Sequence, residues 1–296
     1  MSAVDRYELK FIVSADQRAR FLELSRRLLV VDPHGPGGGY RVSSQYFDTP
    51  DHRGWREKLD GVSNRRKLRL RYYGEVDGEA SFPARAFFLE IKHRASETIR
   101  KERLRLEPAA ARAILDDAGE LLRIGSHAAA TAPDDGALAS MLHLAAGRRL
   151  VAANVITYHR EAWAGAVDSR LRITFDSSLR ALPPDRFLAV SDRVGERLLP
   201  PTRLLLEVKF DTAIPVWVKD VLRVIGLRPG RFSKYATGME ALRVARARGL
   251  VARPEAPNAP VGEEVARTPE TPPAVRRKKL RLRPPRPAPS EPPARR

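Results

Sequence analysis

Polar and apolar residues alternate with a period of two in several short runs of this chain, and most of the polar positions are basic. Lys67, Arg69 and Arg71 follow this rule in RRKLRLRYYG, and Glu207 and Lys209 follow it in LLLEVKF. Residues i and i+2 of a strand point to the same face of a sheet. Each run therefore predicts a β-strand with one apolar and one charged face.

The same reading along the whole chain predicts about eight strands, with helices between or after them. The strands are expected at residues 5–13, 40–49, 65–74, 85–94, 98–107, 150–165, 171–182 and 203–212. The helices are expected directly after Ser14 and at 109–124, 136–148, 215–226 and 236–248, with a short turn or helix at 51–58. This order is typical of an antiparallel α+β fold rather than a βαβ repeat.

Local signals support the first and the later elements. Ser14 followed by Gln17 is a capping-box pattern, which predicts that a helix begins after Ser14 and carries Phe21, Leu24 and Leu28 on one face. Pro215 suits the first turn of a helix. The run 150–165 is long for one strand, so we expect a bend within it.

Composition divides the chain into two parts. Residues 251–296 hold 12 of the 24 prolines and no hydrophobic period, which predicts a disordered, Pro-rich basic tail. Residues 1–250 are long enough for one large domain with a sizeable core. The dense cluster RRKKLRLR in the tail is either solvated or a contact for polyphosphate, anionic lipid, a membrane protein or nucleic acid.

Charge and residue usage narrow the classes of function. The formal net charge is +18, of which +6 belongs to the tail, so the folded part is basic in its own right. Such a balance is typical of proteins that bind nucleic acid, anionic membranes or polyphosphorylated ligands. There is no cysteine and no GxxxxGK[ST] motif, which excludes thiol chemistry and a P-loop. No stretch approaches the roughly 18 apolar residues of a membrane span, so we expect a cytoplasmic protein without an integral membrane segment.

The charged strand faces predict a closed antiparallel β-barrel. A single run of alternating charges is usually a solvated sheet face. Several such runs would place like charges side by side, and these repel unless an anion neutralises them. If the strands close into a barrel, the charges line its interior. A cavity lined by Arg, Lys and a few Glu suits a polyanion, most simply phosphate groups with a divalent metal.

Ten short motifs together resemble one known family, the VTC domain, which is the polyphosphate polymerase domain of the CYTH-like, triphosphate tunnel metalloenzyme superfamily. Each motif is weak alone, but their order and their span from Arg6 to about residue 240 are specific. The motifs are RYELKF, SSQYFDT, EKLDG, RKLRLRYYG, FLEIK, RKERL, YHREAW, LRITFD, LLEVKF and RFSKY.

The resemblance implies a triphosphate tunnel and assigns roles within it. Its implied catalytic set is Lys10, Arg69, Arg71, Lys92, Arg160, Arg172 and Glu207. The further phosphate-binding positions that it implies are Lys58, Lys101, Arg231, Ser233 and Lys234. Glu207 is the first candidate for a Mn²⁺ or Mg²⁺ ligand, and Glu8 and Glu90 could assist it. An ion pair between Glu207 and a neighbouring lysine is the competing reading.

Three functions follow from these observations. The first is a metal-dependent polymerase that transfers the γ-phosphate of ATP to a growing inorganic polyphosphate chain. The second is a triphosphatase in the same tunnel, with water as the acceptor. The third is a non-catalytic polyanion or nucleic-acid binder, which the basic charge supports. Embedded Glu-x-Lys pairs oppose a nucleic acid as the primary ligand, because their acidic members would repel it.

Overall fold

The computed structural model describes residues 7–32, 39–75, 86–95, 98–124 and 136–251, and residues 1–253 form one compact unit. The strands are β1 Tyr7–Ser14, β2 Leu29–Val31, β3 Tyr40–Asp48, β4 Arg65–Tyr73, β5 Phe87–Ala95, β6 Thr98–Leu106, β7 Val151–Gly165, β8 Arg172–Leu182, β9 Glu196–Arg197 and β10 Arg203–Phe210. The helices are α1 Ala15–Ser25, α2 Arg53–Leu59, α3 Pro108–Asp116, α5 Gly136–Gly147, α6 Val216–Val224 and α7 Lys234–Ala247, with a 3-10 turn at Pro184–Arg186. The predicted tail lies outside the described residues, so its disorder stays a prediction.

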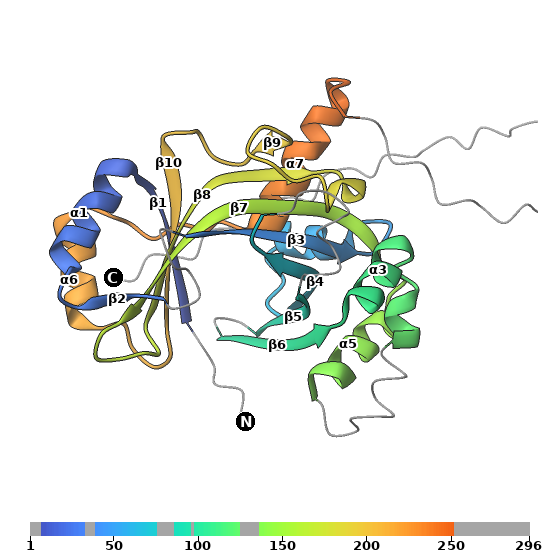
Figure 1. Cartoon of the computed structure of the whole chain (residues 1–296), viewed down its shortest axis with the longest axis horizontal. Coiled ribbons are helices and arrows are strands. Elements are labelled where there is room, and N and C mark those ends of the chain that lie inside the picture. The colour runs from blue at the N-terminus through green and yellow to red at the C-terminus, as the bar shows by residue number, and fades with distance from the viewer. Residues whose placement is uncertain (1–6, 33–38, 76–85, 96–97, 125–135, 252–296) are drawn as a thin grey trace, which may run out of the picture. The chain divides into compact units, whose positions relative to one another are not determined.

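The strands form one antiparallel sheet that curls on itself. Its main path runs β1-β10-β8-β7-β3-β4-β5-β6, while β2 pairs with β7 and β9 pairs with β8. Figure 1 shows β3 to β6 bending round beneath β7. In the described part of the chain, the end strands β1 and β6 are not hydrogen-bonded to each other. The predicted antiparallel α+β fold is confirmed, but the predicted closed barrel is found only as an open, curled sheet.

Two apolar clusters cover the convex face of this sheet. Leu70, Tyr72 and Phe87 are fully buried and pack with side chains of α3 and α5, such as Ile114 and Met141. A second cluster joins β1, β8 and β10 to α1 and α6 on the other side of the unit (Figure 1). Fully burying an aliphatic or aromatic side chain stabilises a fold by about 1.5–3 kcal/mol. These convex-face positions are the apolar half of the period-two pattern.

The third apolar cluster lies on the concave face and holds α7 there. Tyr235, Met239 and Leu242 of α7 pack with inward residues of the sheet, among them Tyr46 and Tyr158. Gly238 lies so close to β7 that an added Cβ would stand 2.4 Å from the Cδ1 atom of Ile156. Helix α7 therefore covers one end of the concave face. Most charged residues of the sheet on this face lie toward the other end.

The local signals in the sequence are mostly reproduced. Ser14 and Gln17 form the predicted capping box at the start of α1. The predicted common face of this helix is wrong beyond Phe21, because α1 ends at Ser25 and Leu24 and Leu28 are 38% and 37% exposed.

Two longer elements also depart from a regular course. The predicted helix at 109–124 is interrupted after Asp116 by extended backbone at Asp117. The bend expected in the long strand β7 appears as a shift in its register with β8 between Thr157 and His159. In the described residues, no helix combines the length and the apolar character that crossing a membrane requires.

Candidate functional site

Strand register brings the charged half of the pattern together on the concave face. Arg69 lies directly opposite Glu90, and Glu90 lies directly opposite Arg103 on the next strand. On the far side of the sheet, Lys10 lies opposite Glu207. Because side chains alternate between faces, these opposed positions share one face. The site is therefore built from the successive strands β4 to β6 and from β1 and β10, which are distant in the sequence.

A first cluster surrounds Glu90, which is 1% exposed. The Nη2 atom of Arg69 lies 2.7 Å from Oε2 of Glu90, and Arg71 approaches the same oxygen at 3.6 Å. The other oxygen, Oε1, contacts Lys101 at 2.5 Å and Arg103 at 2.6 Å. Burial alone would raise the pKa of Glu90, but these four cations hold it far below its ordinary value. Glu90 is thus an ionised acceptor that aligns the two arginines of β4.

A second cluster surrounds Glu207, which is 3% exposed. Its Oε1 atom lies 3.2 Å from Nζ of Lys10 and 2.7 Å from Nζ of Lys234, while Oε2 lies 2.8 Å from Lys209 and 3.1 Å from Arg160. Burial would raise the pKa of Glu207, but the four cations keep it well below its usual range. The ion pair of Glu207 with a neighbouring lysine, which was the alternative to a metal-ligand role, is therefore present.

Asp176 extends this second cluster and is fully buried. Arg160 grips it through two hydrogen bonds, each 2.7 Å long, from Nε to Oδ1 and from Nη2 to Oδ2. Lys234 lies 2.7 Å from Asp176 as well as from Glu207. Burial acts to lower the pKa of Lys234, but the two carboxylates raise it above its ordinary value. Arg160 and Lys234 are therefore held as fixed cations.

Glu8 on β1 connects the second cluster to the strands on the other side of the open sheet. Its Oε2 atom lies 2.9 Å from Nζ of Lys92 on β5 and 3.6 Å from Lys10, and Oε1 lies 3.5 Å from Lys209. Burial would raise the pKa of Glu8, but Lys10 and Lys92 lower it strongly. This carboxylate therefore joins the two halves of the curled sheet by charge where backbone pairing is missing.

Between the two clusters, three lysines face one another across adjacent strands, and two of them also pair with a carboxylate, Lys92 with Glu8 and Lys101 with Glu90. Lys67, Lys92 and Lys101 occupy directly opposed positions on β4, β5 and β6. The Nζ atom of Lys67 donates to Oγ of Ser233 at 2.9 Å. Burial lowers the pKa of Lys67 well below its ordinary value, and Lys92, Lys10, Arg65 and Lys58 lower it further. Like charges directly opposed on a sheet destabilise it, so this row favours an anionic ligand.

The remaining predicted residues lie at the margins of the site. Ser233 is the N-cap of α7, where its Oγ also accepts from the backbone N–H of Ala236. Lys58 on α2 and Arg231 before α7 lie near enough to each other for Arg231 to lower the pKa of Lys58, after the larger effects of burial, Arg65 and Arg94. Arg172 lies 2.8 Å from Oδ2 of Asp32 and donates to the hydroxyl of Tyr40.

A buried hydrogen-bond centre fixes the start of α7. Asp48, 4% exposed, accepts the backbone N–H groups of Thr49, Gly54 and Trp55 at 2.8, 2.8 and 3.0 Å. It also accepts the hydroxyl of Tyr235. Since Tyr235 follows Lys234, this centre sets the position from which Lys234 reaches Glu207 and Asp176.

Four contributors were absent from the predicted site set: Asp176, Lys209, Lys67 and Arg103. The period-two rule contained the signal for each, because Lys67 precedes Arg69 by two, Arg103 follows Lys101 by two and Lys209 follows Glu207 by two. Asp176 stands four residues after Arg172 and so shares its face of β8.

The fit of a divalent metal depends on the carboxylates near Glu207. Among the described residues, no three His, Cys, Asp or Glu side chains are grouped as a metal site. Glu207 and Glu8 face the same space, since Lys10 and Lys209 each contact both. Mg²⁺ commonly takes only one or two carboxylates and completes its shell with substrate phosphates and water. These two glutamates fit that mode, whereas Glu90 belongs to the other cluster.

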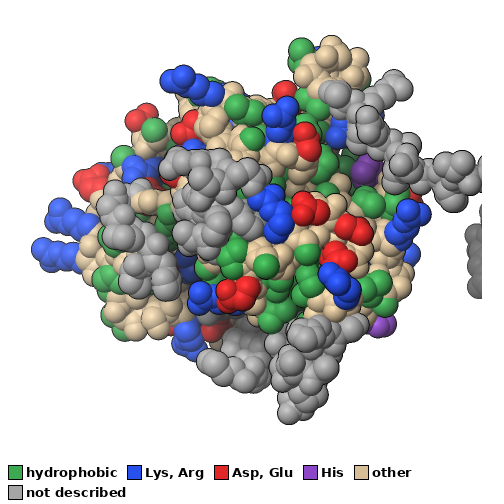
Figure 2. Space-filling view, turned by 45° about the vertical axis from the view of Figure 1, so that its right-hand side comes forward, with side chains coloured by type: hydrophobic (Ala, Val, Ile, Leu, Met, Phe, Trp, Pro, Cys, Tyr) green, Lys and Arg blue, Asp and Glu red, His purple; other side chains and the backbone are tan. Residues whose placement is uncertain are grey.

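On the side seen in Figure 2, basic and acidic side chains are interspersed with hydrophobic ones. His159, which follows Tyr158 on β7, points away from the site and lies 3.2 Å from Asp192. The strongest grouping of basic residues that the contacts define is therefore inside the curl.

A curled antiparallel sheet with a basic concave face, cross-linked by a few buried carboxylates, defines the class of this protein. The model of the VTC domain matches residues 5–243, so the chain belongs to the VTC domain family. The resemblance drawn from the ten motifs is thereby confirmed. No curated protein matches the sequence.

Several solved structures are similar at low identity. A proposed adenylate cyclase from Vibrio parahaemolyticus is 13% identical over 80% of this chain and 98% of its own, with a TM-score of 0.43. A proposed adenylyl cyclase from Hippeastrum, described as having a dominant triphosphatase activity, is 16% identical over 80% and 95%, with a TM-score of 0.40. The Mimivirus capping enzyme triphosphatase is 9% identical over 76% and 89%, with a TM-score of 0.32. Likeness at this level does not assign an activity.

Proposed function

We propose that this protein is a metal-dependent polyphosphate polymerase that uses ATP as its phosphate donor on the concave face of the curled sheet. The observation that carries the proposal is the row of opposed lysines, Lys67, Lys92 and Lys101, between the two carboxylate clusters. An extended chain of phosphates would neutralise this row along its length. Membership of the VTC domain family supports the same substrate class.

The reaction needs positioning and charge neutralisation more than covalent help from the protein. A terminal oxygen of the polyphosphate chain attacks the γ-phosphorus of ATP, the bond to the β–γ bridging oxygen breaks, and ADP leaves with the electron pair. Arg69 and Arg71 would bind the phosphate oxygens in pairs, because a planar guanidinium matches that geometry. Arg160 and Lys234, held by Asp176 and Glu207, would stabilise charge near the transferring group.

Glu207 and Glu8 are the residues that would hold Mn²⁺ or Mg²⁺. A bound divalent cation supplies Lewis acidity and neutralises charge on the phosphates. To contribute oxygens to it, the two glutamates must share them with Lys10 and Lys209, which contact both carboxylates. These lysines would then be released toward the phosphates.

A polymerase and a triphosphatase differ in the acceptor of the phosphoryl group, which is a phosphate chain in one and water in the other. The pKa values of Glu8, Glu90, Asp176 and Glu207 are all lowered, by cations that outweigh burial. A carboxylate with a strongly lowered pKa is a poor general base for activating water. The terminal phosphate of a chain is already ionised and needs no such base. Triphosphate hydrolysis remains the second candidate, because the same phosphate contacts serve it.

The deciding experiment identifies the product. Purified protein is incubated with ATP and either Mg²⁺ or Mn²⁺, and the products are followed by gel electrophoresis and ³¹P NMR. We expect ADP and the resonances of internal phosphoanhydride phosphates, and we expect Glu207→Gln to abolish both. The matched control Glu23→Gln alters a glutamate that is 61% exposed on α1 and should change neither.

Other products would change the assignment. Orthophosphate released from ATP or tripolyphosphate, without chains, would make the protein a triphosphatase. Tight binding of polyphosphate with no turnover under either metal would make it a binding module.

A further inference from the structure

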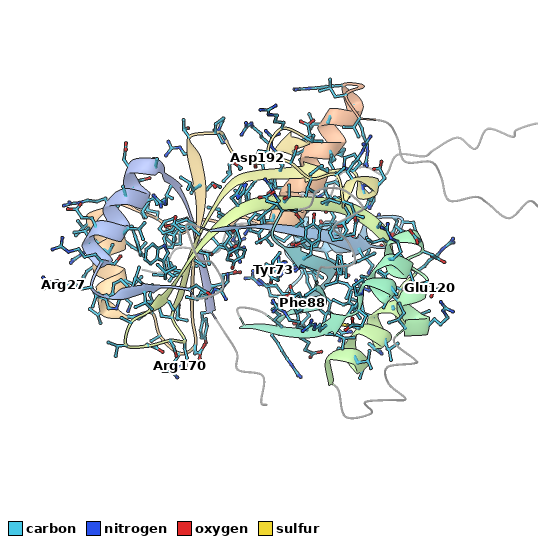
Figure 3. The ribbon with its side chains drawn as sticks, in the orientation of Figure 1. Arg27, Tyr73, Phe88, Glu120, Arg170 and Asp192 are labelled. Carbon is cyan, nitrogen blue, oxygen red and sulfur yellow. The ribbon has the colours of Figure 1, made fainter. Side chains whose placement is uncertain are left out.

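Two aromatic side chains, Tyr73 of β4 and Phe88 of β5, stand on the charged face of the sheet. Tyr72 and Phe87 are fully buried in the convex core, but their neighbours Tyr73 and Phe88 alternate to the concave face and are partly exposed. Figure 3 shows Tyr73 and Phe88 close together on the inner side of β4 and β5. Tyr73, like Tyr40 of β3, also packs against the apolar cluster of the concave face.

The rings form a connected group with Tyr40 of β3. The centroids of Tyr40 and Tyr73 are 5.8 Å apart, and those of Tyr73 and Phe88 are also 5.8 Å apart, both in edge-on arrangements. The guanidinium of Arg103 stands 4.6 Å from the centre of the Phe88 ring. Its Nη2 atom also donates to the hydroxyl of Tyr73 at 2.7 Å. The group therefore combines aromatic faces with a planar cation, the two surfaces on which nucleobases stack.

The aromatic group lies at the end of the site away from α7. Along β4 the inward positions read Arg65, Lys67, Arg69, Arg71 and Tyr73. Lys67 contacts Ser233 and the ring of Tyr235 at the start of α7. Tyr73 stands six residues farther along the strand, about 20 Å away at roughly 3.3 Å per residue. The cationic rows thus lie between α7 and the rings.

We propose that Tyr40, Tyr73 and Phe88 form a platform for the nucleobase of the nucleoside triphosphate. This inference rests on the proposed function, because only a nucleotide donor brings a base into the site. With its triphosphate along the arginines and lysines, the donor must leave its nucleoside at one end of them. Helix α7 fills one end, and the aromatic group occupies the other. Stacking tolerates different bases, so ATP and GTP should bind with similar affinity.

The competing explanation is that the rings only hold the arginines in place. Arg71 lies 5.8 Å from the Tyr73 ring and Arg103 lies over Phe88, so both rings make cation–π contacts with arginines of the Glu90 cluster. In that case, removing a ring would weaken every phosphate ligand alike. A base platform would affect nucleotides alone, and this difference makes the proposal testable.

The test compares two ligands on one variant. Dissociation constants for ATP and for inorganic tripolyphosphate are measured by calorimetry on the full chain, with EDTA present to suppress turnover. We expect Phe88→Leu to weaken ATP binding about tenfold and to leave tripolyphosphate binding within about twofold. Tyr7→Leu removes a ring that stacks on Phe210 outside the site and should change neither constant. Equal losses for both ligands, or no loss for ATP, would overturn the platform.

A measurement on the wild-type protein covers the case in which Phe88→Leu fails to fold. Bound ATP should show upfield ring-current shifts of its adenine H2 and H8 protons, and Phe88→Tyr should retain them. ATP that binds without these shifts would refute the proposal. The outcome is separate from that of the product assay: absence of polyphosphate chains would reject the polymerase, whereas binding and shifts still decide the platform.

Discussion

Lys92 on β5 and Glu8 on β1 form an ion pair, with Nζ and Oε2 2.9 Å apart, across the part of the curled sheet where backbone pairing is missing. The sheet path ends at β1 and β6, so a charged contact rather than a ladder of hydrogen bonds connects its two halves here. Ion pairs are sensitive to salt and to competing anions. A phosphate chain on the concave face would compete with Glu8 for Lys92. Its binding could therefore change the contact between the two halves of the sheet.

Removing either partner should have unequal effects. Glu8→Gln leaves Lys10, Lys92 and Lys209 without a shared counter-ion, and we expect a loss of about 3 kcal/mol in the free energy of unfolding. Lys92→Met leaves Glu8 with two lysines and should cost about 1 kcal/mol or less, since Lys92 is one-third exposed. Urea unfolding measures both, and tripolyphosphate should restore much of the loss in Glu8→Gln. Equal losses, or no effect of the anion, would contradict this account.

The buried lysine row predicts a pH dependence of stability. Because burial and neighbouring cations lower the pKa of folded Lys67 below the unfolded value of 10.5, the unfolded chain holds this proton to higher pH. The wild type should therefore gain stability relative to Lys67→Met as the pH rises from the lowered pKa toward 10.5. Urea unfolding of both proteins between about pH 7 and 10 tests this. A difference that stays flat across the range would show that Lys67 titrates normally.

The affinity for an anion should change with pH in the opposite direction to the stability. A phosphate beside Lys67 favours its charged form and raises its pKa, so binding takes up a proton. The affinity for tripolyphosphate should then fall over the same pH range, and fall less in Lys67→Met. Calorimetry in buffers of different ionisation enthalpy would detect the proton uptake directly. Identical pH profiles for the two proteins would reject the linkage.

Asp48 should matter for activity although it lies outside the charged clusters. Asp48→Asn places an amide where three backbone N–H groups and the Tyr235 hydroxyl donate, and should cost about 2–3 kcal/mol of stability. Tyr235→Phe removes one of these contacts and should cost about 1 kcal/mol. If Asp48 positions Lys234 through α7, turnover should fall in both variants under conditions where both remain folded. Full turnover in folded Asp48→Asn would limit this residue to stability.

Gly238 should resist substitution for steric reasons. An alanine Cβ would lie 2.4 Å from Cδ1 of Ile156 and 3.0 Å from Nδ2 of Asn154, so we expect Gly238→Ala to destabilise the protein by about 1–3 kcal/mol. Ile156→Val deletes the nearest colliding atom, and the double variant should recover part of the loss. Thermal unfolding of the two single variants and the double variant tests the contact. Additive losses would show that the clash lies elsewhere.

Much of the fold follows from the alternation of polar and apolar residues along the strands and from local helix caps. The alternation of Lys67, Arg69 and Arg71 with Leu68 and Leu70 fixed one face as charged and the other as core before any pairing was known. Ser14 and Gln17 marked the start of α1 because a capping box is made by neighbours in the chain. The alternation could not show that β1 and β6 stay unpaired, because closure depends on curvature summed over all the strands.

Most residues of the candidate site could be predicted from the sequence, but the contacts between them could not. Motif order indicated Glu207, Glu90 and the basic residues, and the structure brings Glu207 and Glu90 into separate clusters. Nothing in the sequence linked Asp176 to Lys234, which stand 58 positions apart and meet at 2.7 Å. Alternation places Tyr73 on the face of Arg71 and Phe88 on that of Glu90, but only the structure shows that the two rings lie together.

The sequence by itself determined which side chains share a face, because the backbone geometry of a strand turns every second residue the same way. It also determined the family, because the order of the motifs can be read along the chain without knowing any distance in space. Only the tertiary structure decided which carboxylate neutralises which cation and which lysines are left facing each other. Those partners come from the register of strands far apart in the chain and from the docking of α7, and Coulomb energies depend on these distances in space.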